Sequence, residues 1–208
     1  MATSSIDQAI QETFPVAVAL HDGLLPAAGK TGTRNILASD GVYRELTMDW
    51  MVRVKRIAQC SLPYGSLQES LTFCIVPPPL ALWSEFVQAA RLALPCEAAA
   101  VMVWNTTSMT WRLSLRKSVS ADADHIAYEN AELSDDEVAV VDIHSHGTAG
   151  AFFSATDDKD DEGGIKIAAV VGKVDKDTPE IALRLQAIDE RLPLALASDG
   201  HITERLPA

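Results

Sequence analysis

The sequence lacks several features that define common classes of protein. It has only three cysteines in 208 residues, Cys60, Cys74 and Cys96, and none of them has the Cys-x-x-Cys spacing. An odd, widely spaced set gives no disulfide framework, so we expect buried free thiols in a reducing cytosol. No apolar run approaches the length of a membrane span, and a membrane is therefore not an expected partner.

Two signatures of zinc enzymes are also missing. The string His-Glu-x-x-His, which places two zinc ligands on one helix of many metalloproteases, does not occur in the chain. Zinc-dependent nucleobase deaminases need His-x-Glu and Pro-Cys-x-x-Cys, and Pro95-Cys96 is followed by no second cysteine at that spacing. The helical metalloproteases are therefore excluded, and the deaminases are disfavoured.

Positive charge is scarce in the second part of the chain. Residues 1–120 contain 10 Lys and Arg against 9 Asp and Glu, whereas residues 121–208 contain 7 against 20. An acidic surface repels phosphate backbones, which argues against nucleic acid as a partner. The first 20 residues have no basic segment before their short apolar run. We therefore expect no signal peptide and a cytoplasmic protein.

Three consecutive prolines in the segment "VPPPL", residues 76–80, form the clearest break in the chain. Such a run cannot continue a helix or a central strand. Before it, "FPVAVAL" and "WMVRVKRIA" have the composition of strands, and turns containing Gly and Asp separate them. We therefore predict an N-terminal β-rich extension, residues 1–76, and a second domain, residues 77–208.

The second domain begins with a long helix and continues mainly with strands. The segment "LALWSEFVQAARLAL" places Trp83, Phe86, Val87, Ala90 and Leu94 at helical spacing and stops at Pro95. Residues 154–164 open a short acidic helix or loop. Strand-like runs occupy residues 98–104, 110–119, 137–146, 165–174 and 180–188. This order predicts a mixed α/β fold, a sandwich of helices and sheet.

The stretch "VVDIHSHGTAGAFFSATDDKDD" carries chemistry that a strand does not need. Side chains alternate along a strand, so His144 and His146 lie on one face and Ser145 on the other. Two imidazoles one pleat apart can reach the same ion, and Asp157 at the start of a following helix can reach back to the strand end. Two histidines, a carboxylate and an open position are typical of catalytic zinc. Ser154 and Asp157 also fit a capping pair at the start of a helix, which is compatible with a site.

The joint spacing His-Ser-His, seven residues, Ser, two residues, Asp resembles the signature of the JAMM (MPN+) family of zinc isopeptidases. The resemblance implies a cytidine-deaminase-like α/β sandwich with a mixed sheet. It also implies that His144, His146 and Asp157 bind Zn²⁺, and that Ser154 helps to hold the oxyanion of a tetrahedral intermediate.

The same family has a catalytic glutamate at the start of a strand that follows the first long helix. Here Glu97 comes two residues after Pro95, directly after the predicted helix. Glu45, Glu69 and Glu85 are competitors, but the first two precede the helix and the third lies within it. The resemblance therefore implies Glu97 as the general base.

The segments "VVDIHSHG", "AFFSATDDKDD" and "PCEAA" are similar to the bacterial PRTRC system protein A group within this family, from about the proline turn to Gly172. Members of that group sit beside ubiquitin-like and ubiquitin-activating-enzyme-like proteins. The resemblance implies an amide bond at the C-terminus of a ubiquitin-like modifier as substrate, and the ubiquitin-like protein or its conjugate as partner. A non-catalytic scaffold with the same fold, which only binds a protein, is the alternative.

The sequence departs from the family pattern in the loop between the histidines and the serine. Many members have Pro after the second histidine and before the serine, where this chain has Gly147 and Phe153. We expect this loop to be more flexible. Phe152 and Phe153 either line a groove or, more commonly for adjacent aromatics, anchor the loop. Asp142, on the face of His144, is expected to be a solvated or structural carboxylate.

The remaining histidines and two tryptophans are not expected to take part in a site. His21, His125 and His201 each lie in a segment with the composition of a turn or loop, which predicts surface histidines. Trp104 and Trp111 flank the turn "NTTSM" and are expected to pack on the sheet.

Overall fold

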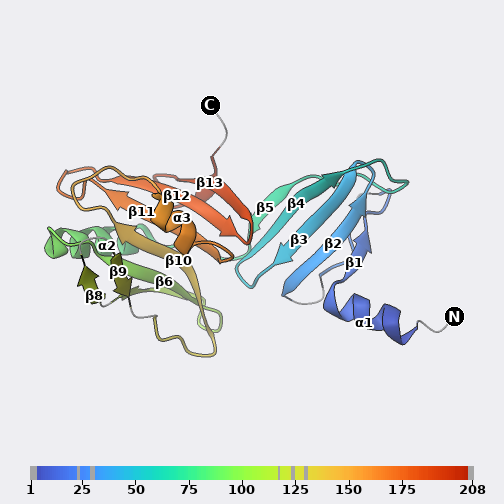
Figure 1. Cartoon of the computed structure of the whole chain (residues 1–208), viewed down its shortest axis with the longest axis horizontal. Helices are drawn as coiled ribbons and strands as arrows, with labels where there is room; N and C mark the ends of the chain where they lie inside the picture. The colour runs from blue at the N-terminus through green and yellow to red at the C-terminus, as the bar shows by residue number, and fades with distance from the viewer. Residues whose placement is uncertain are drawn as a thin grey trace. The chain divides into compact units, whose positions relative to one another are not determined.

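The computed structural model describes residues 4–22, 24–28, 31–116, 118–122, 125–128 and 131–205. The chain forms two compact units, Met1–Val76 and Pro77–Ala208 (Figure 1). Each unit has its own sheet. In the described part of the chain, no helix is both long enough and apolar enough to cross a bilayer.

The first unit consists of one helix, α1 (Ser5–Thr13), and a five-stranded sheet within the described residues. The strands follow one another in the sheet in the same order as in the chain. Only the β1–β2 pair is parallel, and the other neighbours are antiparallel. The strands are β1 (Val16–Val18), β2 (Gly32–Ala38), β3 (Gly41–Thr47), β4 (Met51–Gln59) and β5 (Ser70–Phe73).

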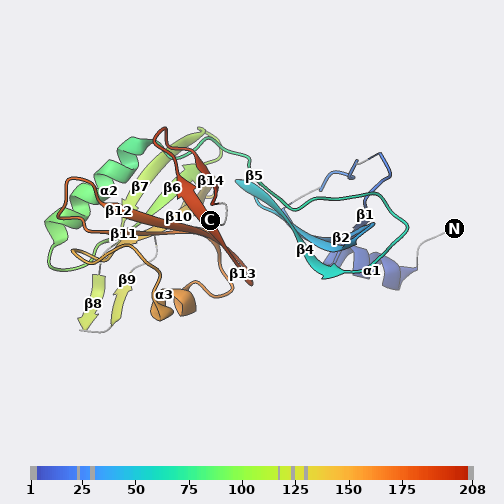
Figure 2. The same cartoon turned by 90° about the horizontal axis from the view of Figure 1, so that it is seen from above.

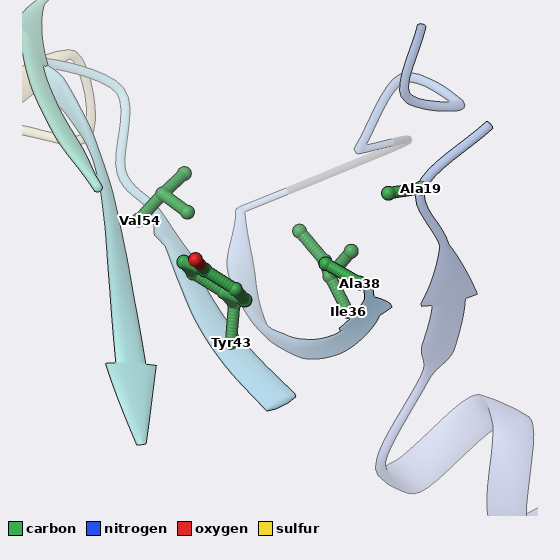
Figure 3. Packing of buried hydrophobic residues seen from close by; sticks show 5 residues of the cluster. All are labelled: Ala19, Ile36, Ala38, Tyr43 and Val54. Atoms are coloured by element: carbon green, nitrogen blue, oxygen red, sulfur yellow. The ribbon is translucent and has the colours of Figure 1, made fainter. Parts of the chain in front are cut away.

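A small apolar cluster lies on this sheet (Figure 3). The Tyr43 ring is part of this cluster. Its hydroxyl donates a hydrogen bond to the carbonyl oxygen of Leu67 at 2.9 Å, so the buried side chain keeps a polar partner. The predicted β-rich character of the N-terminal region is confirmed, although α1 was not predicted. The buried members of the cluster are Ala19, Ile36, Ala38, Tyr43 and Val54.

The second unit is built on a seven-stranded mixed sheet in the described residues, with the order β14-β13-β12-β11-β10-β6-β7. The β10–β11 pair is parallel and the other pairs are antiparallel. A further pair, β8 (Ser118–Asp122) and β9 (His125–Tyr128), forms a separate ribbon. The strands of the main sheet are β6 (Ala99–Asn105), β7 (Thr110–Leu115), β10 (Glu137–Ser145), β11 (Ile165–Gly172), β12 (Glu180–Ala187), β13 (Glu190–Leu196) and β14 (Ile202–Glu204).

Two helices lie on opposite faces of the main sheet (Figure 2). The long one, α2 (Leu80–Ala93), buries Trp83, Phe86 and Ala90, three of the five positions that the helical spacing predicted. The other two, Val87 and Leu94, are only partly buried, and Leu94 follows the helix as its C-cap. The short one, α3 (Ala155–Asp160), joins β10 to β11 and has no buried side chain. The mixed α+β class predicted from the order of elements is confirmed.

Two expectations about single residues are wrong. The cysteines are free as expected but exposed, because Cys60, Cys74 and Cys96 each follow the end of an element, where the chain runs over the surface. His125 begins strand β9 and pairs with Asp122 of β8 instead of lying in a loop. Its side chain is outside the part of the chain that the structure describes.

The other expectations of this kind are confirmed. His21 and His201 are exposed and lie outside the strands and helices. Trp104 and Trp111 are paired across β6 and β7 with ring centroids 5.3 Å apart, and Trp104 is buried. These two rings therefore pack on the sheet.

Candidate metal centre

Strand β10 carries the two histidines to the end of the sheet between two neighbouring strands. His144 lies opposite Ala99 of β6 and Val170 of β11. His146 follows the strand end, and its backbone N–H still donates to the carbonyl oxygen of Val171 at 2.9 Å. The backbone at both histidines is thus fixed by the sheet.

The two imidazoles and the Asp157 carboxylate converge on one point. The Nε2 atoms of His144 and His146 are 3.2 Å apart. Asp157 places Oδ1 3.2 Å from Nε2 of His144 and Oδ2 3.9 Å from Nε2 of His146. In all, the three residues present ligand atoms within 4.8 Å of one another.

Asp157 is held by the start of α3. The Ser154 Oγ accepts a hydrogen bond from the Asp157 backbone N–H at 3.2 Å, and Asp157 Oδ2 accepts one from the Ser154 N–H at 2.6 Å. This reciprocal pair is a capping box. The cap uses an oxygen lone pair of Ser154 and leaves its hydroxyl hydrogen free for another acceptor. Capping and a role in the site are therefore compatible.

The observed distances fit a tetrahedral zinc ion. Nitrogen and oxygen ligands about 2 Å from such an ion lie about 3.3 Å from one another, which is close to the spacings at this site. The donor set is also suitable, because two neutral imidazoles and one carboxylate are common ligands of catalytic zinc. Burial alone raises the pKa of the Asp157 carboxyl, but hydrogen bonds with His144 and with the Ser154 N–H bring that pKa well below its usual value. Asp157 is therefore an anion at neutral pH.

Glu97 lies beside this cluster. A cavity of about 380 Å³ is lined by Glu97 together with His146. The rest of its lining comes from the segment before β6 and from the loop after β10. Glu97 is exposed, so its carboxylate is available to a molecule that enters the cavity. The other residues of the lining are Leu94, Pro95, Gly147, Thr148 and Ala149.

The competing glutamates lie elsewhere. Glu45 is buried and forms an ion pair with Arg34 at 2.7 Å in the first unit. Glu69 belongs to the same unit and lies 3.4 Å from Arg53. Glu85 is on the exposed side of α2. Of the four glutamates compared, Glu97 is the one that lines this cavity together with His146.

Ser145, between the two histidines, connects the strand to the segment that carries Glu97. Its side chain is fully buried, and its Oγ accepts a hydrogen bond from the Ala98 N–H at 2.9 Å. Its own N–H donates to the carbonyl oxygen of Ala98, also at 2.9 Å. Sequence reasoning placed Ser145 on the opposite face and assigned it nothing. The available signal was a small hydroxyl residue on a strand face that is otherwise apolar, after Val141 and Ile143.

The loop after His146 is hydrogen-bonded to the segment that follows β11 at two points. The Gly147 carbonyl oxygen accepts from the Val174 N–H at 3.0 Å, and the Ala149 carbonyl oxygen accepts from the Lys173 N–H at 2.6 Å. Gly147 has φ of 55°, a conformation that a proline cannot adopt. At Gly172 a Cβ atom would lie 2.3 Å from the Ala151 nitrogen, so the loop depends on a glycine there.

The adjacent phenylalanines have different surroundings. Phe152 is 53 % exposed, and its ring meets the His146 imidazole edge-on with centroids 4.7 Å apart. Phe153 is partly buried, with the guanidinium carbon of Arg184 3.9 Å from its ring centroid. Phe153 thus anchors the loop as expected, whereas Phe152 lies open beside the cluster of His144, His146 and Asp157.

Asp142 is a structural carboxylate. It accepts a hydrogen bond from Lys166 Nζ at 2.8 Å and forms an ion pair with Arg116 at 3.3 Å. Both oxygens are therefore engaged, as expected for a group outside the chemistry.

The fold and the His144–His146–Asp157 cluster are those expected of a JAB/MPN domain, and the comparison of sequences agrees. Residues 79–186 match the family described as prokaryotic homologs of the JAB domain, and the chain belongs to this family. The predicted resemblance to the JAMM family is thereby confirmed. Residues 4–74 match a domain of unknown function, DUF2016. The JAB-domain family includes metalloproteases and also inactive members.

Individual proteins add little to this assignment. No curated protein matches the chain. A solution structure of a protein from Desulfitobacterium hafniense aligns with a TM-score of 0.41 and 17 % identity, over 61 % of this chain and 87 % of that one. The assignment therefore rests on the family match together with the geometry of the site.

Proposed function

We propose that the protein is a zinc-dependent metallopeptidase or isopeptidase that hydrolyses an amide bond. The observation that carries the proposal is the convergence of His144, His146 and Asp157 at distances suited to one ion, next to a cavity that Glu97 lines. A zinc site alone is compatible with a structural role. A carboxylate in the adjoining cavity, not among the three ligands, gives this site a group that can move protons.

In this proposal the ligands of the Zn²⁺ cofactor are His144, His146 and Asp157. Bound zinc lowers the pKa of water towards neutrality and polarises a carbonyl group. The Glu97 carboxylate accepts a proton from the attacking water and later donates it to the departing amine. The Ser154 hydroxyl donates a hydrogen bond to the oxygen that becomes negative in the tetrahedral intermediate.

Replacement of Ser154 by alanine tests its role. We expect kcat to fall by about 100-fold or more with little change in KM, because an oxyanion donor acts on the transition state. The same change also removes the helix cap, at a cost of about 1 kcal/mol. Ser154→Gly is the matched variant, since glycine at this position costs only about a few tenths of a kcal/mol. Both variants should lose turnover alike and keep their zinc, whereas an effect confined to KM would contradict the role.

We further propose a ubiquitin-like protein or its conjugate as the substrate, cleaved at the C-terminal end of the modifier. The family match and the resemblance to the PRTRC system protein A group support this choice. A ubiquitin-activating-enzyme-like protein is a second proposed partner. The cavity beside His146 has small and apolar residues, Gly147, Ala149 and Leu94, along its walls, which suits a narrow chain end.

The function is tested with fusions in which a candidate ubiquitin-like modifier precedes a reporter protein. We expect the zinc-loaded full chain to separate the two at the modifier's C-terminus. Cleavage should stop after a chelator removes the metal and return when Zn²⁺ is added back. Stable binding of the fusion without cleavage by the zinc-loaded protein would instead favour a non-catalytic scaffold.

A further inference from the structure

The helix that carries Asp157 has no buried side chain to anchor it to the sheet. None of the residues of α3 is buried, and the helix is only six residues long. A helix this short is not stable in isolation. The position of α3 must therefore depend on polar contacts, and several of these, besides the Ser154 cap, involve one side chain, Arg184 of β12.

Arg184 stands on the face of the sheet that carries the histidines. It lies opposite Ala168 of β11, and Ala168 lies opposite Asp142 of β10, so the three residues share a face. His144 comes two residues after Asp142 and shares that face as well. Arg184 and the metal ligands of β10 therefore point to the same side, towards α3.

The guanidinium of Arg184 contacts the chain on both sides of the Ser154–Asp157 pair. Its Nη1 donates to Asp158, directly after Asp157, and its Nη2 donates to Asp161 Oδ2 at 2.6 Å, one turn further on. On the other side, its plane lies over the ring of Phe153, directly before Ser154. One rigid group thus fixes the residues that flank the cap and the carboxylate.

Lys166 reinforces the same arrangement from β11. Its Nζ lies 2.7 Å from Asp161 Oδ1 and 2.8 Å from Asp142 Oδ2. Asp161 at the end of α3 is thereby tied to Asp142, two residues before His144. These ion pairs connect the end of the helix to the histidine strand.

The burial of Arg184 is unfavourable for the stability of the fold. Its contribution is therefore to hold neighbouring groups in position. Its side chain is only 8 % exposed, and the ion pair with Asp161 is buried on both sides. In the described part of the chain its Nε is buried without a hydrogen-bond partner. Buried ion pairs are weak contributors to stability, and an unpaired buried donor is unfavourable. The planar group nevertheless donates to two carboxylates from separate nitrogens while its carbon lies over an aromatic ring, a geometry that the compact ammonium of lysine does not reproduce.

We propose that Arg184 is a positioning residue for the metal centre, which holds Asp157 in place by gripping Phe153, Asp158 and Asp161. This inference rests on the proposed function, because it concerns the zinc that His144, His146 and Asp157 would bind.

The test measures the affinity of the full chain for Zn²⁺ by competition with a chelator of known affinity. Removal of a group that orients a metal ligand typically lowers affinity about 10–100-fold, and we expect that loss for Arg184→Ala. Arg184→Lys should recover only part of the affinity. The thermal unfolding of each metal-free variant is followed in parallel, so that a loss of affinity is read only on folded protein.

A double-mutant cycle shows whether Arg184 acts through Asp157. In an Asp157→Ala background, adding Arg184→Ala should change zinc affinity by no more than about a factor of two, because the ligand it positions is already gone. A further large fall in that background would overturn the inference, since the arginine would then act on the histidines or on the whole fold.

Arg112→Ala is the matched control. Arg112 pairs with Glu137 through two hydrogen bonds of 2.6 and 2.7 Å at the first residue of β10, away from α3. The Arg112→Ala variant should lower the thermal stability of the protein without changing its affinity for zinc. If Arg184→Ala does not fold, Asp158→Ala serves instead, because Asp158 is more exposed and its loss removes one of the three contacts.

The outcomes separate the two proposals. A wild type that binds zinc tightly, with Arg184→Ala or its substitute Asp158→Ala binding equally well, would overturn the role of Arg184 and leave the proposed function standing. A wild type that does not bind zinc would overturn both.

Discussion

Replacing His146 by alanine is expected to yield a folded protein that purifies without zinc and does not hydrolyse its substrate. His146 contributes one of the three converging ligand atoms, and its side chain is only 11 % exposed. Only two ligands remain in this variant. The loss of zinc affinity should therefore exceed the roughly 10–100-fold loss typical of groups that merely support a ligand. Zinc content is measured by elemental analysis of protein expressed with ample metal.

His201→Ala is the control for this prediction, because His201 is exposed and belongs to the same unit without approaching the cluster. It should retain the zinc content of the wild type. Zinc bound equally by wild type and His146→Ala would contradict the ligand assignment. A zinc-free wild type would leave the hydrolase proposal without its cofactor.

Replacing Glu97 by glutamine is expected to abolish hydrolysis while zinc content and thermal stability stay unchanged. Glutamine has nearly the same shape but cannot accept and return a proton at this position. General acid–base groups contribute about 10²–10⁴-fold to rate, so kcat should fall by at least that lower value. The measurement is turnover of the cleaved fusion together with zinc content.

Glu85→Gln is the matched variant, an exposed glutamate on α2 that does not line the cavity. It should behave as wild type in both measurements. Loss of zinc in Glu97→Gln would indicate that Glu97 is a ligand and not a base, and unchanged turnover would assign the proton transfer to another group.

Much of the fold could be predicted because its main elements have strong periodic patterns. Trp83, Phe86 and Ala90 recur at helical spacing, and these are the residues that α2 buries. Strand β6 is a continuous apolar run, as expected for a strand covered on both faces. By contrast, α1 has few apolar residues, and β13 contains Pro193, which weakens its strand signal.

The site could be predicted only in part, because spacing along a chain does not report contacts between distant segments. The alternation of β10 placed His144 and His146 on one face, and the structure brings Asp157 to them. Glu97 was inferred only from a family resemblance, since no local pattern links it to His146, about 50 residues later. Arg184 gave no signal at all, because its partners Asp158 and Asp161 belong to an acidic run that is equally typical of a solvated helix start.

The two hydrogen bonds between Ser145 and Ala98 have a consequence for how the site tolerates change. They clamp the peptide next to Glu97 onto the same residue that separates the two imidazoles. Glu97 and the two histidines thus lie on two chain segments that these hydrogen bonds join. Drift in remote parts of the domain would shift them together and leave their mutual spacing intact.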